Sequence, residues 1–317
     1  MKRFSFNEVL NVKRVVFLLK KGISTLVFVV YNVEYCVCKR IQAFINASLN
    51  NSITSICEKN FAKPLVTGNY NTTRMRIKDK NITNVTDLLK HLKADTKDLK
   101  TPVWFRGHSK KDYTLLPSLF RYSKIPNETN LIEKFKQNAT LLLNDNHRED
   151  INWLFIMQHN GVPTRLLDWS ESPLVALYFA CNSEKKSEGT LNVLLPIELN
   201  KLASIKQNHI VSINDSAIQQ RYSPEAYRSE STSSMLPVAV ICPRNTPRIQ
   251  AQLGTFTIFH KDNTKIDEIG DKKHIWRYII PASAKTNILK ELDLLGIDEF
   301  RLFPELPSLG SIIKNNI

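Results

Sequence analysis

Glycine is scarce in this sequence, with nine among 317 residues. A phosphate-binding loop built from glycines needs several of them close together, and neither a Walker motif nor a G-x-G-x-x-G dinucleotide motif occurs. The nucleophile elbow G-x-S-x-G is absent as well. A glycine-rich phosphate loop is therefore excluded, and any phosphate recognition would depend on arginines and helix N-termini.

Cysteine is also sparse, with five residues. Cys36 and Cys38 form a C-x-C pair, but no second pair completes a zinc pattern, and the H-E-x-x-H motif is missing. The odd number and the wide spacing do not fit a disulfide framework, so we expect reduced thiols in a cytoplasmic protein. We expect no bound metal.

Acidic residues are few relative to basic ones, which gives a net charge of +14. Residues 1–66 hold ten Lys or Arg and three acidic residues, and so carry half of this charge in a fifth of the chain. The rest is only mildly basic, and its 42% hydrophobic content is that of an ordinary globular protein. We therefore predict a basic, apolar N-terminal extension over residues 1–66 and a folded domain over 67–317.

The extension lacks an apolar run long enough to span a bilayer comfortably. Residues 22–38 are apolar and lie between basic pairs, and as a helix they would measure about 25 Å against a hydrocarbon core of about 30 Å. Three alternatives stay open: a single-pass span, an interfacial helix that contacts a membrane through residues 13–40, and an extension packed on the main domain or on a protein partner. We favour the last, in a cytoplasmic protein.

Strands and helices are mixed in the main domain without a regular βαβ alternation. Capping residues and apolar spacing predict helices over 84–93 (with Thr86 as N-cap), 130–143, 151–159, 174–183 and 284–295 (with Ser283 as N-cap). Apolar and alternating runs predict strands over 103–105, 190–196, 238–242, 249–259, 276–280 and 300–303. Residues 200–235 are polar and read as a surface insertion. This mixture indicates the α+β class, with a mixed or antiparallel sheet and flanking helices.

Four clusters could carry chemistry. In the first, Arg106 ends a short apolar strand next to Gly107, where its guanidinium could bind a phosphate or pair with an internal acid. The second, residues 158–170, gathers polar groups between two apolar helices, and these either brace a loop or line a site. The third, residues 248–256, places two glutamines on one face of the expected strand. The fourth, residues 302–306, reads as packing.

Within the second cluster, His159 suits a general base or a histidine at a helix C-terminus. Arg165 and Asp168 suit either a ligand site or an internal salt bridge.

Taken together, the clusters resemble the FRG domain family. Its name motif stands at residues 105–107, and the similarity continues through QHNGVPTRLLDWSESPLVALYFA at 158–180, AQLGTF at 251–256 and GIDEFRLFPEL at 296–306. The resemblance covers roughly residues 84–309. FRG domains are mostly bacterial or carried by phages and mobile elements, so it implies a role in such a system, for example in defence, but defines no biochemical activity.

A fold-level analogy to arginine-type ADP-ribosyltransferases adds an expectation. Those enzymes carry an early strand arginine, then a strand and helix, then a late glutamate. Arg106, residues 168–180 and Gln252 follow the same order, so the analogy implies that Arg106 holds the pyrophosphate of NAD, Ser170 orients the ribose, and Tyr178 or Phe179 stacks. Gln252 stands where the glutamate would be, which leaves Asp168 or Glu171 to supply the charge.

Two hypotheses for function follow. One is a nucleotide-binding effector or ADP-ribosyltransferase-like enzyme, with NAD or ADP-ribose as ligand. The other is a non-enzymatic module that binds nucleic acid or a protein. The catalytic candidates are Arg106, His159, Asp168 and Gln252, and the ligand-binding candidates are Arg106, Gly107, Gln158, Arg165, Ser170 and Tyr178.

Overall fold

The computed structural model describes residues 14–21, 24–31, 77–143, 150–205, 207–229, 235–261 and 263–315. The chain divides into two compact units, Met1–Thr73 and Arg74–Ile317. In the first unit, β1 (Arg14–Lys21) pairs antiparallel with β2 (Ser24–Tyr31), and both strands are rich in valine, leucine and phenylalanine. A helix over residues 22–38 is therefore wrong where β2 lies, and residues 22, 23 and 32–38 are outside the described residues.

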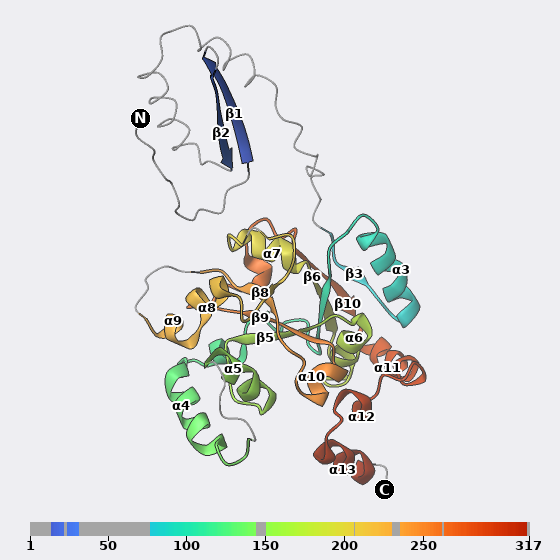
Figure 1. Cartoon of the computed structure of the whole chain (residues 1–317). Helices are drawn as coiled ribbons and strands as arrows, with labels where there is room; N and C mark the ends of the chain where they lie inside the picture. The colour runs from blue at the N-terminus through green and yellow to red at the C-terminus, as the bar shows by residue number, and fades with distance from the viewer. Residues whose placement is uncertain are drawn as a thin grey trace. The chain divides into compact units, whose positions relative to one another are not determined.

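The second unit contains the remaining helices and strands of Figure 1. Its strands are β3 (Lys80–Asn81), β4 (Trp104–His108), β5 (Leu166–Ser170), β6 (Gly189–Leu194), β7 (Val211–Ser212), β8 (Val238–Ile241), β9 (Gly254–Ile258) and β10 (Ile275–Ile280). Its α-helices are α3 (Val85–Thr96), α4 (Glu128–Ala139), α5 (Asp150–His159), α6 (Pro173–Cys181), α7 (Pro196–Leu202), α8 (Ser216–Tyr222), α9 (Pro224–Arg228), α10 (Pro247–Ala251), α11 (Lys285–Leu294), α12 (Glu299–Leu302) and α13 (Leu306–Asn315). Short 3₁₀ turns are η1 (Ser118–Arg121), η2 (Ile266–Glu268) and η3 (Ala282–Ala284).

These strands form one eight-stranded sheet in the order β3-β10-β6-β4-β5-β9-β8-β7. The two outermost pairs, β3 with β10 and β7 with β8, are parallel, and the inner pairs are antiparallel. The unit is thus an α+β fold with a mixed sheet and flanking helices, as the sequence predicts.

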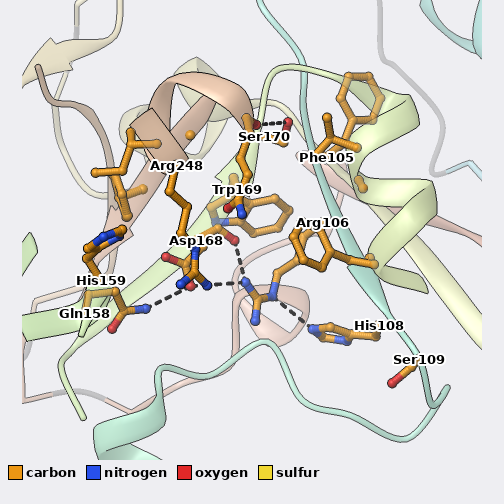
Figure 2. Close-up of a pocket in the computed structure, with 18 of the residues that line it drawn as sticks. Phe105, Arg106, His108, Ser109, Gln158, His159, Asp168, Trp169, Ser170 and Arg248 are labelled. Carbon is orange, nitrogen blue, oxygen red and sulfur yellow. Dashed lines mark hydrogen bonds and ion pairs between the residues drawn. The ribbon is translucent and has the colours of Figure 1, made fainter. Parts of the chain in front are cut away.

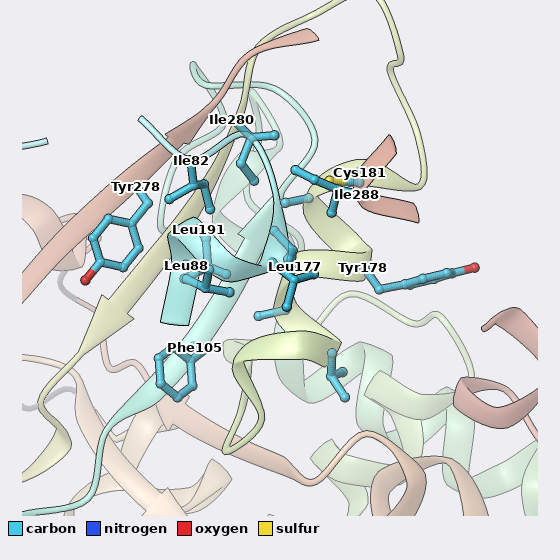
Figure 3. Packing of buried hydrophobic residues seen from close by; sticks show 14 of the residues in the cluster. Ile82, Leu88, Phe105, Leu177, Tyr178, Cys181, Leu191, Tyr278, Ile280 and Ile288 are labelled. Carbon is cyan, nitrogen blue, oxygen red and sulfur yellow. The ribbon is translucent and has the colours of Figure 1, made fainter. Parts of the chain in front are cut away.

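Successive residues of β4 face different cores, as the pleat of a strand requires. Phe105 packs in a cluster with α3, α6 and α11, which Figure 3 shows, whereas Trp104 packs with η1 and the loop after β9. A third cluster lies under α5, α8 and the strands β7 to β9.

The cap of α6 is as expected: Ser172 accepts a hydrogen bond from the Val175 backbone N–H, and proline follows at the first helical position. Two other predicted caps are wrong. Asn84, not Thr86, caps α3 by accepting from the backbone N–H of Asp87, and no side chain caps α11, which follows directly from η3.

Residues 200–235 are not a surface insertion. This segment supplies the edge strand β7 together with α8 and α9, and five of its apolar side chains are buried in the core under α5: Ile205, Val211, Ile213, Ile218 and Tyr222. The segment reads as polar because its exposed positions are rich in polar residues, while the apolar ones are widely spaced in sequence.

Two predicted strands are partly or wholly helical. Residues 247–251 form α10, which Thr246 caps and Pro247 begins, so β9 starts only at Gly254. Residues 299–302 form α12, which Asp298 caps by accepting from the Arg301 backbone N–H. In both cases a capping residue begins a helix, although the apolar spacing alone favours a strand.

Candidate functional site

A cavity of about 350 Å³ opens where β4 and β5 separate (Figure 2). β4 pairs with β6 along its whole length but with β5 at one position only, Phe105 opposite Ser170. In a continued antiparallel ladder Gly107 would lie opposite Asp168. The strands diverge instead, and the gap is bounded by side chains from β4, β5, α5, α6 and α10.

Arg106 bridges the gap with its side chain. Its Nη1 donates to the backbone carbonyl of Asp168 at 2.6 Å, and its Nε donates to Nε2 of His108 at 3.0 Å. Burial lowers the pKa of Arg106 to about 10, partly offset by Asp168, so the guanidinium remains charged at neutral pH. Nη2 has no hydrogen-bond partner among the described residues, and it is the nitrogen left for a ligand.

His108 is held neutral beside this arginine. Burial, and then the charges of Arg106 and Arg121, lower the pKa of His108 to about 3. A neutral imidazole can accept the Arg106 Nε–H bond, whereas an imidazolium could not. His108 therefore orients the guanidinium without adding a positive charge.

Asp168 is the acidic residue that lines the cavity, and its side chain is 52% exposed. Gln158 Nε2 donates to its Oδ2 at 2.8 Å, and Gln158 Oε1 accepts from the Thr164 hydroxyl at 2.6 Å. Nη1 of Arg106 forms an ion pair with Oδ2 at 3.7 Å, which is longer than a hydrogen bond. The carboxylate is thus fixed by an amide, while Oδ1 has no partner among the described residues.

Two further arginines line the cavity, and the sequence reasoning missed both. Arg121, in η1, donates through Nε and Nη2 to the carbonyl of Leu116. Arg248, in α10, stacks 4.7 Å over the ring of Phe303 and makes no hydrogen bond or ion pair in the described part of the chain. Arg248 is the first residue of the third cluster, so the sequence contained a signal for it. The predicted strand, however, indicated the two glutamines as the candidate residues.

His159 lines the cavity from the end of α5. Its Nε2 lies 3.4 Å from Oε1 of Glu305, an oxygen that is buried without a hydrogen-bond partner among the described residues. Burial lowers the pKa of His159, with the carboxylate of Glu305 acting in the opposite direction. The histidine is therefore neutral at pH 7 but has a carboxylate nearby if it gains a proton.

Ser170 and Gln252 line the cavity, but their side chains make hydrogen bonds to other residues of the fold. The Ser170 hydroxyl donates to the Gln252 backbone carbonyl at 2.7 Å and accepts from the Ser172 N–H at 3.0 Å. Gln252 lies at the C-cap of α10, not on a strand, and its Nε2 donates to the carbonyl of Leu302 at 3.0 Å. The two glutamines therefore do not share a strand face, and Gln250 is exposed.

Gly107 allows α6 to lie directly against β4. A Cβ at this position would be 1.9 Å from the Ala176 carbonyl oxygen and 2.6 Å from the Ala180 nitrogen, both backbone atoms. The same helix carries Phe179, whose ring lines the cavity. The glycine thus places the helix that forms one wall.

The structure does not bring Arg165 or Tyr178 into the cavity. Arg165 is 0% exposed, donates from Nε to both carboxylate oxygens of Glu128 at 2.9 Å, and reaches the carbonyls of Phe259 and Tyr222. The assignment of Arg165 to ligand binding is therefore wrong, because all three nitrogens of its guanidinium donate to acceptors inside the fold. Tyr178 packs in the cluster of Figure 3, and of the aromatic pair on α6 only Phe179 lines the cavity.

Glu171, the other acid that could supply the charge in the analogy, also lies outside the lining, with Oε2 2.5 Å from Nη2 of Arg244. Among the described residues, no three His, Cys, Asp or Glu side chains are placed to hold a metal ion. No helix of the described residues has the length and apolar character needed to cross a membrane.

Comparison with protein families gives a match that covers part of this site. Residues 101–189 match the family model of the FRG domain. This chain carries an FRG domain. The matched range runs from the loop before β4 to the first residue of β6, and it contains Arg106, Arg121, His159 and Asp168.

The FRG match does not reach Arg248 or Gln252, which complete the cavity from later in the chain. No curated protein and no solved structure matches the chain.

Proposed function

We propose that the cavity of this FRG domain binds a nucleotide that contains a pyrophosphate, with NAD and ADP-ribose as the ligands. The observation that carries the proposal is that Arg106, Arg121 and Arg248 line one cavity together with a single carboxylate, Asp168. With both histidines neutral, the lining has an excess of two positive charges. Guanidinium groups bind phosphate oxygens through directed, charge-assisted hydrogen bonds.

The three arginines keep donors available for a ligand. Nη2 of Arg106, Nη1 of Arg121 and the whole guanidinium of Arg248 have no hydrogen-bond acceptor among the described residues. Arg106 and Arg248 are half-buried and Arg121 is exposed, so these donors are accessible from the cavity, and an anion with several oxygens is the fitting occupant. The volume of about 350 Å³ is at the small end for ligand sites, which suits the pyrophosphate and one riboside rather than a whole dinucleotide.

The analogy to ADP-ribosyltransferases supports NAD within this class. Arg106 lies on β4, and residues 168–170 lie on β5, which leads into α6. In that arrangement Arg106 binds the pyrophosphate, Ser170 lies beside the nicotinamide ribose and Phe179 stacks. We place this activity in a bacterial or phage effector, as the family resemblance implies.

Titration calorimetry with NAD and with ADP-ribose tests the proposal. We expect Arg106→Gln to weaken binding roughly tenfold to a hundredfold, because a charge-assisted hydrogen bond contributes about 1.5–3 kcal/mol. The matched control is Arg277→Gln, which removes an exposed arginine paired with Asp79 outside the cavity lining and should leave both affinities unchanged. The proposal is wrong if the unaltered chain binds neither nucleotide.

The alternative is a non-enzymatic module for nucleic acid or a protein partner. It is favoured by Gln252, which stands in place of the late glutamate of the analogy. The side-chain amide of Gln252 donates a hydrogen bond to the carbonyl of Leu302. Binding to DNA or RNA would weaken steeply with added salt, because phosphate contacts release counterions. Tight, salt-dependent binding of a polyanion without any binding of NAD would favour this alternative.

A further inference from the structure

We propose that Asp168 makes the cavity select a nucleotide whose ribose carries a positively charged ring, such as the oxidised nicotinamide of NAD, and that it promotes hydrolysis of that N-glycosidic bond. This inference rests on the proposed nucleotide binding and specifies its substrate.

The carboxylate of Asp168 forms an ion pair with Arg106 but accepts no hydrogen bond from it. An acid whose only role is to hold an arginine would accept short, paired hydrogen bonds from the guanidinium. Here Arg106 Nη1 donates to the backbone carbonyl of Asp168 at 2.6 Å and lies 3.7 Å from the carboxylate oxygen Oδ2. The carboxylate itself takes a hydrogen bond from the neutral amide of Gln158 at 2.8 Å.

A ligand that is anionic throughout gains nothing from this acid. A carboxylate among phosphate-binding arginines repels phosphate oxygens, and at half exposure that repulsion is only partly screened. Its presence fits a ligand that is negative at one end and positive at the other. Oxidised nicotinamide nucleotides have this pattern, because the pyridinium ring is cationic and the pyrophosphate is anionic.

The walls of the cavity suit a flat cationic ring. Phe105, Phe179 and Val175 supply apolar surface near Ser170 on the β4 and α6 side, and Phe155 and Phe256 supply it on the α5 and β9 side. Aromatic faces attract a cation that is shielded from water. Figure 2 shows Asp168 between Arg106 and the pair Gln158 and His159, so the acid lies between the proposed phosphate end and the histidine.

The reaction needs only water as a second reactant. The bond between the anomeric carbon and the ring nitrogen breaks, and its electron pair leaves with nicotinamide, which becomes neutral. The anomeric carbon becomes cationic as this bond lengthens, and the carboxylate of Asp168 stabilises that charge. A water oxygen then bonds to the carbon and releases one proton, which the neutral His159 accepts next to Glu305. The products are ADP-ribose, nicotinamide and a proton.

Calorimetry of the full chain with NAD⁺, NADH and ADP-ribose tests the selectivity. We expect NAD⁺ to bind about fivefold more tightly than NADH, whose ring is neutral, and Asp168→Asn to abolish this difference. The variant should bind ADP-ribose at least as well as the unaltered chain. If it weakens ADP-ribose as much as NAD⁺, the acid only positions Arg106 and the inference is overturned.

Nicotinamide release from NAD⁺, followed by chromatography, tests the reaction. We expect Asp168→Asn to lower the rate roughly a hundredfold or more, as for the loss of one group that stabilises developing charge. His159→Gln should lower kcat while keeping the preference for NAD⁺ over NADH. NAD⁺ binding without release of nicotinamide would overturn the hydrolysis and leave the nucleotide proposal standing, whereas no binding of any nucleotide would overturn both.

Discussion

Gly107 lies on β4 where the backbone of α6 packs directly against the strand. The Cβ of any other residue would overlap backbone atoms of that helix, which cannot move aside as a flexible side chain can. Because Arg106 precedes it and Phe179 lies on the same helix, the glycine couples the arginine of the family motif to the opposite wall of the cavity.

We expect Gly107→Ala to lower the free energy of unfolding by about 3 kcal/mol or more, since overpacking against rigid backbone is among the costly substitutions. Urea unfolding followed by circular dichroism measures this. Gly310→Ala is the matched control: Gly310 lies in α13, where an added Cβ meets no atom within 4 Å, and it should change stability by less than about 1 kcal/mol. Equal midpoints for the two variants would show that α6 can shift.

At the scale of elements, Arg165 ties together parts of the fold that are distant in sequence. From the residue before β5 it reaches Glu128 at the start of α4, the carbonyl of Tyr222 at the end of α8 and that of Phe259 after β9. The guanidinium also stacks 4.7 Å from the ring centre of Tyr227 in α9. The polar residues of the second cluster thus divide into two groups, those that brace and those that line the cavity.

We expect Arg165→Met to destabilise the fold by about 3–5 kcal/mol, because it leaves Glu128 buried without its partner. Adding Glu128→Gln should recover part of this loss. Denaturant unfolding measures both, and calorimetry on the folded variant should show nucleotide affinity close to that of the unaltered chain. A large loss of affinity in a fully folded Arg165→Met chain would return Arg165 to the ligand site.

The elements around the cavity differ in how far local sequence predicts them. The helices α5 and α6 and the strand β4 follow from apolar spacing, caps and the stop at Gly161, whose positive φ suits glycine. The helix α10 does not, because a Thr-Pro start competes with an alternating pattern that continues into β9. That conflict also explains why Arg248 was missed.

At the scale of the whole molecule, the two units carry different properties. The unit from Arg74 contains the FRG match, the cavity and the three buried clusters, and so has the core expected of an independent domain. The charge of the first 66 residues lies in the other unit, and membrane or partner contact through residues 13–40 stays a proposal for that unit.

A chain that begins at Arg74 should fold cooperatively and bind NAD with the affinity of the full chain, which thermal unfolding and calorimetry can measure. Sedimentation with vesicles of anionic lipid then tests the N-terminal unit: basic residues near such a surface contribute about 1 kcal/mol each. If the full chain and the shortened chain sediment equally, the N-terminal unit is no anchor. Failure of the shortened chain to fold would show that residues 1–73 complete its core.

The sequence by itself determined the α+β class, the FRG motif and the residues Arg106, Gln158, His159 and Asp168 that line the cavity, because caps, spacing and motifs are local. Only the tertiary structure decided that Arg121 and Arg248 join them, that Arg165 is internal and that five apolar residues of the segment 200–235 belong to the core. The reason is physical: the acceptors of a guanidinium and the partners of an apolar side chain come from segments far apart in the chain, and burial selects among them only once the sheet has formed.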